Sequence, residues 1–350
     1  MNLTMKNLII LTCILLGFSG CTTNSTTTQE SSTVSVADAR DEGESTMESN
    51  VPFHDMTIPY LRSRSYPSTM GDLRPLSTKS TYSSFTTNYT SDGLRINALI
   101  TKPAGNMPEG GWPAIVFVHG YIPPSLYVTT TRYLDHVDYL ARNGYVVFKI
   151  DLRGHGNSEG TPGGAYYSSD YIIDTLSART ALQNLDFVNK NRVGLWGHSM
   201  AGNVVIRSLA SQPDIPAVAI WAGAGFTYTD LLTYRINDTS YRPPQPSAST
   251  TPSRRQLLFA QHGQFTPESP YWKTVAPTNY LTDVNGAVSL FHAVDDTVVS
   301  VEYSRNLKKI LDSTPIEHSF YEYSSGGHNI TGSSFSQAMR STVEFYNKHL

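Results

Sequence analysis

The chain has 350 residues, of which 39% are hydrophobic and 16% charged, enough to bury one large core or two modest ones. Its 26 Lys and Arg residues nearly balance 29 Asp and Glu residues, so the formal net charge is only −3, and no basic stripe suggests a nucleic-acid partner. Both cysteines, Cys13 and Cys21, lie near the N-terminus, which excludes an internal disulfide, a thiolate metal site or a catalytic cysteine from the body of the chain.

The first residues, 1–20, have the pattern of an export signal. Lys6 supplies the positive start, and Leu8–Phe18 forms an apolar core that is too short to span a membrane. The ending Phe18-Ser19-Gly20-Cys21 resembles the lipobox of bacterial lipoproteins, in which Cys21 becomes the lipidated first residue of the mature chain. A simple secretory signal cut nearby is the alternative. We expect an exported protein with an N-terminal lipid anchor, held on the outer side of the bacterial cytoplasmic membrane or in the periplasm or cell envelope.

Residues 21–82 are predicted to form a tether and an N-terminal extension. From Cys21 to Asn50 the chain is Ser/Thr-rich, polar and acidic, and burial cannot offset the entropy that such a segment would lose on ordering. Residues 51–80 carry apolar side chains, among them Ile58, Leu61 and Tyr66. These are enough to dock on the surface of a domain but too few to build one.

Regular structure is predicted from residue 83 to residue 350. It begins with a hairpin whose turn is Ser91-Asp92-Gly93, and apolar β-rich runs then alternate with helical patterns. The predicted strands cover 85–89, 94–102, 114–119, 145–151, 193–197, 217–221, 288–293 and 317–323. The predicted helices cover 131–143, 171–185, 200–211, 301–311 and 333–350. Near-continuous apolar strands separated by helices predict an α/β fold with a mostly parallel central sheet, covered by helices on both faces.

One connection, after the sixth predicted strand, is longer than the others. Residues 224–286 include a Pro-rich run at 243–246, a Ser/Thr-rich run at 247–252 and several aromatic side chains. Insertions of this length in a compact domain are usually lids or binding loops, or else disordered. The aromatic residues favour a lid that lines a pocket, and the alternative is a small helical cap packed for stability alone.

The run Val193–Val205 carries the main chemical signal. An apolar strand leads through Gly197-His198-Ser199-Met200-Ala201-Gly202 into a helical pattern. A serine on such a turn has a strained backbone and a hydroxyl held clear of the sheet edge, and its neighbours two positions away must be small because strand and helix touch there. Gly197 and Ala201 meet that requirement. The turn therefore predicts Ser199 as a nucleophile.

Acyl transfer by serine also needs a base and a group that orients the base, which follow in the order Ser, acid, His in α/β-hydrolases. Of the later histidines, His328 stands in a glycine-rich loop between the last predicted strand and the last helix, where its ring can reach the serine. The acid should leave the preceding strand, where Asp295 and Asp296 are adjacent. Asp296 is preferred because it lies farther past the strand, with Asp295 as the alternative.

Two backbone N–H groups are expected to bind the developing oxyanion. The serine turn positions the N–H of Met200, and the loop Val118–Tyr121 should supply the second donor, either the N–H of Tyr121 or, less simply, its phenol. The sequence has no phosphate-loop or HExxH pattern, and two adjacent aspartates are poor evidence for a metal. No metal and no cofactor are therefore expected.

Together these motifs resemble the catalytic domain of the prolyl oligopeptidase and dipeptidyl-peptidase family of α/β-hydrolases. The motifs that carry the resemblance are Val118–Gly120, Asp151–Ser158, Gly197–Gly202, His292–Val299 and Gly326–Ile330, which lie within residues 83–350. The acid of that family stands in a His-Gly-x-x-Asp-x-x-Val-Pro pattern. The pattern falls on His292, Asp296 and Val299, with Ala293 in place of Gly and Ser300 in place of Pro.

The resemblance implies a serine hydrolase that works through an acyl-enzyme, most simply a serine-type peptidase acting on short peptides. Peptidases of this family usually carry a β-propeller before the hydrolase domain, and the segment between Cys21 and Ser83 is too short to form one. A carboxylesterase of the same fold is therefore a close alternative. A binding lipoprotein that has lost turnover is a third possibility, against which the complete Ser, Asp, His order argues.

Overall fold

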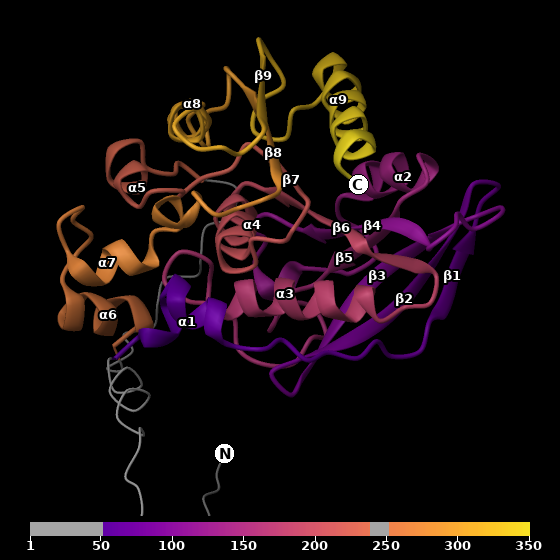
Figure 1. Ribbon diagram of the computed structural model, residues 1–350, viewed down its shortest axis with the longest axis horizontal. Coiled ribbons are helices and arrows are strands. Elements are labelled where there is room, and N and C mark those ends of the chain that lie inside the picture. The colour runs from indigo at the N-terminus through magenta and orange to yellow at the C-terminus, as the bar shows by residue number, and fades with distance from the viewer. Residues whose placement is uncertain (1–51, 239–251) are drawn as a thin grey trace, which may run out of the picture. The chain divides into compact units, whose positions relative to one another are not determined.

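The strands of the computed structural model, which describes residues 52–238 and 252–350, form one sheet with helices on both faces (Figure 1). In their order across the sheet they are β1 (Arg74–Thr78), β2 (Tyr82–Ser91), β3 (Leu94–Pro103), β5 (Val146–Ile150), β4 (Trp112–Val118), β6 (Val188–His198), β7 (Ala217–Trp221), β8 (Ala287–Ala293) and β9 (His318–Tyr323). The pairs from β1 to β5 are antiparallel, and those from β5 to β9 are parallel. The predicted mostly parallel central sheet is confirmed.

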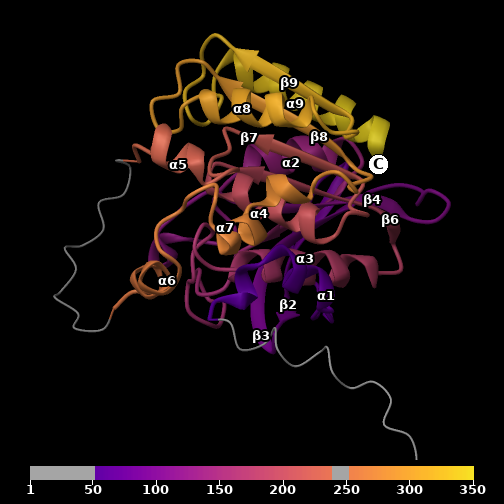
Figure 2. The same cartoon turned by 60° about the vertical axis from the view of Figure 1, so that its left-hand side comes forward.

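Two layers of helices cover this sheet. Helices α2 (Leu134–Arg142) and α9 (Ser333–His349) pack on one face, and α3 (Asp170–Gln183), α4 (Met200–Ser211) and α8 (Glu302–Leu311) pack on the other (Figures 1 and 2). Each face has its own hydrophobic cluster. Every residue of α4 is buried, because this helix contacts β6 and β7 beneath it and α3 beside it. A helix enclosed in this way is mostly apolar, and its buried polar side chains, Asn203, Arg207 and Ser208, are hydrogen-bonded to carbonyl oxygens.

The predicted hairpin between β2 and β3 is formed by its two-residue turn. Ser91 and Leu94 pair at its end, so the loop between them has two residues, Asp92 and Gly93. Both adopt left-handed conformations, with φ of 48° and 78°. Two-residue hairpin loops favour this geometry because its twist matches that of the flanking strands, and Asp-Gly is a preferred sequence for it.

The predicted start of regular structure is residue 83, but in the structure the folded unit begins earlier in the chain. Strand β1 adds an edge to the sheet beyond β2, and α1 (Ile58–Ser63) packs against α4 with Ile58 and Leu61 fully buried. The buried guanidinium of Arg207 in α4 donates a hydrogen bond of 2.7 Å to the carbonyl oxygen of Met56, which fastens the N-terminal segment to the domain. The side chains of Ile58 and Leu61 therefore dock on the domain.

The connection between β7 and β8 folds into short helices. They are α5 (Thr229–Thr233), α6 (Arg254–His262), α7 (Pro270–Val275) and the 3-10 turn η4 (Pro277–Tyr280). Two further 3-10 turns, η2 (His54–Met56) and η3 (Pro124–Leu126), lie elsewhere in the chain. Helix α7 contacts α1, on the side of the sheet that carries α4 (Figure 2). No helix within 52–238 or 252–350 is long and apolar enough to cross a membrane.

Three predictions fall outside the described residues. They concern the export signal at 1–20, the lipidation site Cys21 with the tether that follows it, and the part of the insertion from 239 to 251. These remain expectations from the sequence.

Candidate active site

Ser199 lies at the turn between β6 and α4, with φ of 56° and ψ of −119°. Such a backbone conformation costs a residue with a side chain on the order of 1–3 kcal/mol and persists only where the surroundings impose it. The Ser199 N–H donates to the carbonyl oxygen of Trp221 at 2.9 Å, and the Ser199 carbonyl accepts from Gly202 N–H at 2.9 Å and from Ala224 N–H at 3.3 Å. The end of β7 and the first turn of α4 therefore hold the serine in the strained geometry that the turn motif predicts.

Small residues make this turn possible. A Cβ added to Gly197 would lie 2.8 Å from the carbonyl oxygen of Ala201, closer than real Cβ contacts allow. A Cβ on Gly202 would lie 2.7 Å from the Cα of Gly223 in the segment after β7. Strand, helix and neighbouring segment thus meet at backbone distance around Ser199, and any larger residue at these positions would push them apart.

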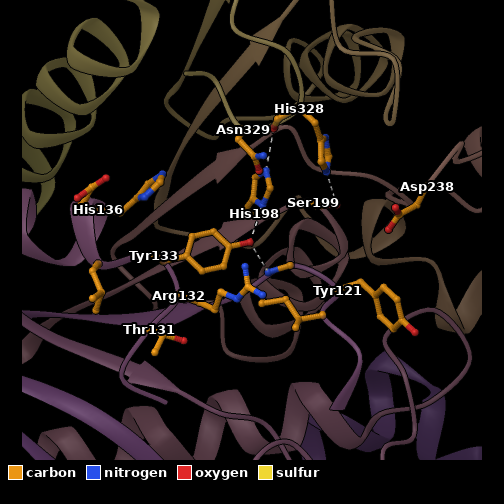
Figure 3. A pocket seen from close by; sticks show the side chains of 14 residues that line it. Tyr121, Thr131, Arg132, Tyr133, His136, His198, Ser199, Asp238, His328 and Asn329 are labelled. Carbon is orange, nitrogen blue, oxygen red and sulfur yellow. Dashed lines mark hydrogen bonds between the residues drawn. The ribbon is translucent and has the colours of Figure 1, made fainter. Parts of the chain in front are cut away.

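A continuous chain of hydrogen bonds joins Ser199, His328 and Asp296. The Oγ of Ser199 lies 2.8 Å from Nε2 of His328 (Figure 3), and Nδ1 of His328 lies 2.8 Å from Oδ2 of Asp296. The residues come from the segments after β6, β9 and β8, which all end at the same edge of the parallel part of the sheet. An ionised carboxylate only accepts, so Nδ1–H donates to Asp296, and Nε2 of the neutral ring accepts from the serine hydroxyl.

Asp296 is built into its loop as an ionised carboxylate. Its Oδ1 accepts from Val298 N–H at 2.8 Å and from Val299 N–H at 2.9 Å, while Nε2 of His292 lies 3.2 Å from Oδ2. Burial by itself raises the pKa of Asp296, but the hydrogen bonds of His292 and His328 outweigh it and hold the pKa well below its usual range. His292 belongs to the motif that carries Asp296, and its ring is a second partner of this carboxylate.

The depressed pKa predicts an acid-sensitive contribution to stability. An unfolded aspartate has a pKa of about 3.9, above that of folded Asp296, so the stabilisation is complete above this value and is lost as pH falls through the folded pKa. Urea unfolding of the wild type and of Asp296→Asn should therefore differ most near about pH 6 and least near about pH 3. A difference that grows on acidification would contradict the depressed pKa.

Asp295, the alternative acid of the sequence analysis, does different work. Its carboxylate accepts hydrogen bonds from the backbone N–H groups of Gly326 at 3.2 Å and Gly327 at 2.8 Å. These glycines directly precede His328, so Asp295 fixes the loop that carries the histidine, whereas Asp296 contacts the imidazole ring. The adjacent carboxylates thus hold the backbone and the side chain of the same residue.

The expected oxyanion donors lie on the two segments that flank Ser199. Met200 is the first residue of α4, and the N–H groups in the first turn of a helix have no acceptor within the helix. Tyr121 lies in the segment after β4, and its side chain is 45% exposed. Figure 3 shows its ring turned away from Ser199 and His328, so the phenol is not directed at the serine and the backbone N–H is the remaining candidate.

Comparison with known proteins gives one family and several relatives. A model of the serine aminopeptidase family S33 matches residues 113–245. The uncharacterized peptidase YtmA of Bacillus subtilis is 25% identical over 240 residues, which cover 68% of this chain and 83% of YtmA. Among solved structures, dipeptidyl peptidase 4 of Porphyromonas gingivalis has a TM-score of 0.58 at 20% identity, over 77% of this chain but only 36% of that one. Acetyl xylan esterase 1 of a Thermoanaerobacterium species has a TM-score of 0.56 at 19% identity, over 83% of this chain and 91% of that one.

The matched family region contains the serine turn, and the structural similarities establish the fold. The chain has the α/β-hydrolase fold, and its residues 113–245 resemble the serine aminopeptidase family S33. It is accordingly a serine hydrolase, as the sequence analysis predicts. The chain spans most of the length of YtmA but only about a third of the dipeptidyl peptidase.

The pocket of this hydrolase opens over Ser199 and has a volume of about 530 Å³ (Figure 3). Most of its wall comes from the segment between β4 and the first turn of α2. The lining residues are Gly120, Tyr121, Ile122, Thr131, Arg132, Tyr133, Leu134, Asp135, His136, His198, Ser199, Asp238, His328 and Asn329. A concave site of this size suits a small-molecule or short-peptide substrate.

The described part of the insertion contributes little to that wall. Of residues 224–238 and 252–286, Asp238 alone lines the pocket. The aromatic side chains of the insertion instead form a separate hydrophobic cluster, in which Tyr228 and Trp272 are buried together with Met56 of the N-terminal segment. These contacts fit a small packed cap, and the predicted lid at 224–286 remains a prediction.

Two buried charged residues, Lys149 and Asp151, bind the segment that forms the pocket wall. Lys149 on β5 is fully buried and donates to the hydroxyl of Tyr127 at 2.9 Å and to the carbonyl oxygen of Thr129 at 2.6 Å. Asp151, two residues along, accepts from the hydroxyl of Thr129. Burial lowers the pKa of Lys149 to about 8 and raises that of Asp151 to about 6. Segment 121–133 has little regular structure of its own, so these side chains hold it against the sheet.

Proposed function

We propose that this hydrolase is a serine-type peptidase that cleaves short peptides through an acyl-enzyme. In this proposal Ser199 is the nucleophile, His328 the general base and then the general acid, and Asp296 the carboxylate that orients the base. The hydrogen-bonded chain from Ser199 through His328 to Asp296, anchored on the strained turn, is the observation that carries the proposal.

The reaction follows from the directions of these hydrogen bonds. The Oγ of Ser199 attacks the substrate carbonyl carbon while its proton passes to Nε2 of His328, and Asp296 stabilises the imidazolium that forms. The N–H groups of Met200 and Tyr121 bind the oxyanion of the tetrahedral intermediate. The imidazolium returns its proton to the leaving amine as the C–N bond breaks. Water, deprotonated by His328, then hydrolyses the acyl-enzyme and frees Ser199.

A carboxylesterase with the same chemistry is the second candidate, and one observation favours it. The chain covers nearly the full length of the acetyl xylan esterase but only the smaller part of the dipeptidyl peptidase. Ester hydrolysis is less demanding, because an alkoxide leaves more readily than an amine and depends less on protonation by His328. The family model and the name of YtmA point instead to peptides.

Active-site labelling with a fluorophosphonate, followed by paired assays on short-chain aryl esters and on aminoacyl or dipeptidyl arylamides, tests the proposal. Labelling at Ser199 with turnover of arylamides supports a peptidase. Labelling with turnover of esters alone replaces it with the esterase. A folded protein that neither labels nor turns over either substrate would be a binding lipoprotein.

We propose further that the protein is exported and anchored by a lipid on Cys21, on the sequence pattern alone. In a bacterial host, Cys21→Ser should abolish incorporation of a labelled fatty acid and move the protein from the membrane fraction to the soluble fraction. Cys13→Ser lies inside the predicted signal and is the matched control, with no expected change in the mature protein. Retention of Cys21→Ser in the membrane fraction would exclude this anchor.

A further inference from the structure

The hydroxyl of Tyr133 stands at the centre of a second hydrogen-bonded chain beside Ser199. Gly120 N–H lies 3.1 Å from the Tyr133 hydroxyl, which lies 2.8 Å from Nδ1 of His198, and Nε2 of His198 lies 2.9 Å from the carbonyl oxygen of His328 (Figure 3). Gly120 precedes the proposed oxyanion donor Tyr121, and His328 is the proposed base. The chain therefore runs from the segment of the oxyanion donor to the loop of the base.

The direction of each bond in this chain is determined. A carbonyl oxygen only accepts, so Nε2 of His198 must carry the hydrogen that bonds to His328. Burial, reinforced by the neighbouring His328 ring, lowers the pKa of His198 well below its usual value, so the ring is neutral and Nδ1 is an acceptor. Tyr133 then donates its hydroxyl proton to Nδ1, and its oxygen accepts from Gly120 N–H. Each group serves one neighbour as donor and another as acceptor.

The neighbours of Tyr133 keep its hydroxyl in place. The residue has φ of 59°, a left-handed conformation that is uncommon for tyrosine, at the position that caps the start of α2. Its ring packs edge-on against Phe117 at 5.5 Å and Trp196 at 6.0 Å between centroids. A Cβ on Gly120 would come within 3.0 Å of both the Tyr133 hydroxyl and Nδ1 of His198. A larger residue at position 120 would therefore have to displace one of these two groups, whereas glycine leaves both in place.

We propose that Tyr133, acting through His198, is a positioning residue for catalysis. This inference rests on the proposed function, with Ser199 as nucleophile and His328 as base. These three hydrogen bonds hold the Gly120–Tyr121 backbone and the His328 backbone at a fixed separation before charge develops on the oxyanion and on the imidazole. Electrostatic stabilisation depends on such prior placement of donors, and small misplacements are costly to rate.

Tyr133→Phe removes the hydroxyl and keeps the ring, so it tests the inference with the fold preserved. We expect kcat, per active site titrated with fluorophosphonate, to fall by about 10- to 100-fold with little change in KM. Tyr145→Phe is the matched control, because it also removes the hydroxyl of a tyrosine whose ring packs on the same face of the sheet, and this hydroxyl donates to Asn347 at 2.6 Å. That control should keep kcat within about twofold, since unpairing a hydrogen bond away from the site affects stability rather than rate.

His198→Gln is the second variant, and the two substitutions should not be additive. Because both act through one chain, the double variant should lose no more in kcat than the more impaired single variant. Wild-type kcat per titrated site in both single variants, or a loss in Tyr133→Phe that Tyr145→Phe reproduces, would overturn the inference. Failure of the proposed function has a different signature, because Ser199→Ala, measured in parallel, would then retain turnover whatever Tyr133→Phe does.

Discussion

Ser199→Ala should lower kcat by at least about 10⁵-fold and abolish fluorophosphonate labelling, because no other atom can take the place of Oγ beside Nε2 of His328. The midpoint of thermal unfolding should stay within roughly 2 °C of the wild type, since the substitution removes one part-buried hydrogen bond and keeps the turn. Steady-state assays and a thermal melt of the same preparation measure both effects.

Ser208→Ala is the matched control for that experiment. Ser208 is buried in α4, the helix that begins directly after Ser199, and its hydroxyl donates to the carbonyl oxygen of Val204 at 2.9 Å. It should keep wild-type kcat and label normally. Turnover by Ser199→Ala with wild-type kinetics would place the nucleophile elsewhere, and mass spectrometry of the labelled peptide would then identify it.

Asp296→Asn should lower kcat by about 10⁴-fold with the fold intact. An amide facing Nδ1 of His328 can donate a hydrogen to it, which stabilises the tautomer with the proton on Nε2. In that tautomer Nε2 cannot accept the proton of Ser199, and the positive charge formed on the ring during attack loses its carboxylate partner. Initial rates across the pH range, with circular dichroism as a check on folding, measure the loss.

Asp295→Asn is the matched control, because it changes the adjacent residue in the same way. The asparagine carbonyl can still accept one of the two hydrogen bonds from Gly326 and Gly327, so we expect a loss within about tenfold. The reverse ranking, with Asp295→Asn the more damaging, would make Asp295 the orienting acid. The pair of variants thus decides between the two carboxylates that the sequence leaves open.

The insertion shows a place where local chemistry leaves two interpretations open. Its aromatic residues favour a lid over a pocket, but Tyr228 and Trp272 lie in a cluster with Met56 of the N-terminal segment. An aromatic side chain is equally suited to lining a pocket and to filling a core, and only its three-dimensional neighbours distinguish the two. Strand β1 of the N-terminal segment could not be predicted from the sequence, because its residues are all exposed and show no alternation of polar and apolar positions.

Features that depend only on residues close together in the chain could be predicted from the sequence alone. Helix α4 and strand β7 occupy the predicted residues, the hairpin turns at Asp92-Gly93, and glycine stands where strand and helix meet around Ser199. Periodicity, turn chemistry and steric exclusion act over a few residues, so they are written in short runs of sequence. The order of Ser199, Asp296 and His328 likewise followed from motifs, each of which is local.

Only the tertiary structure decided how those pieces meet. It brings Tyr133 and His198, which are 65 residues apart in the chain, to hydrogen-bond distance, and it gives the two adjacent aspartates separate partners in the His328 loop. Neither arrangement leaves a periodic or spaced pattern in the sequence. A hydrogen bond between distant segments is set by the packing of the whole sheet and its helices, and the same residue types in a different fold would not meet.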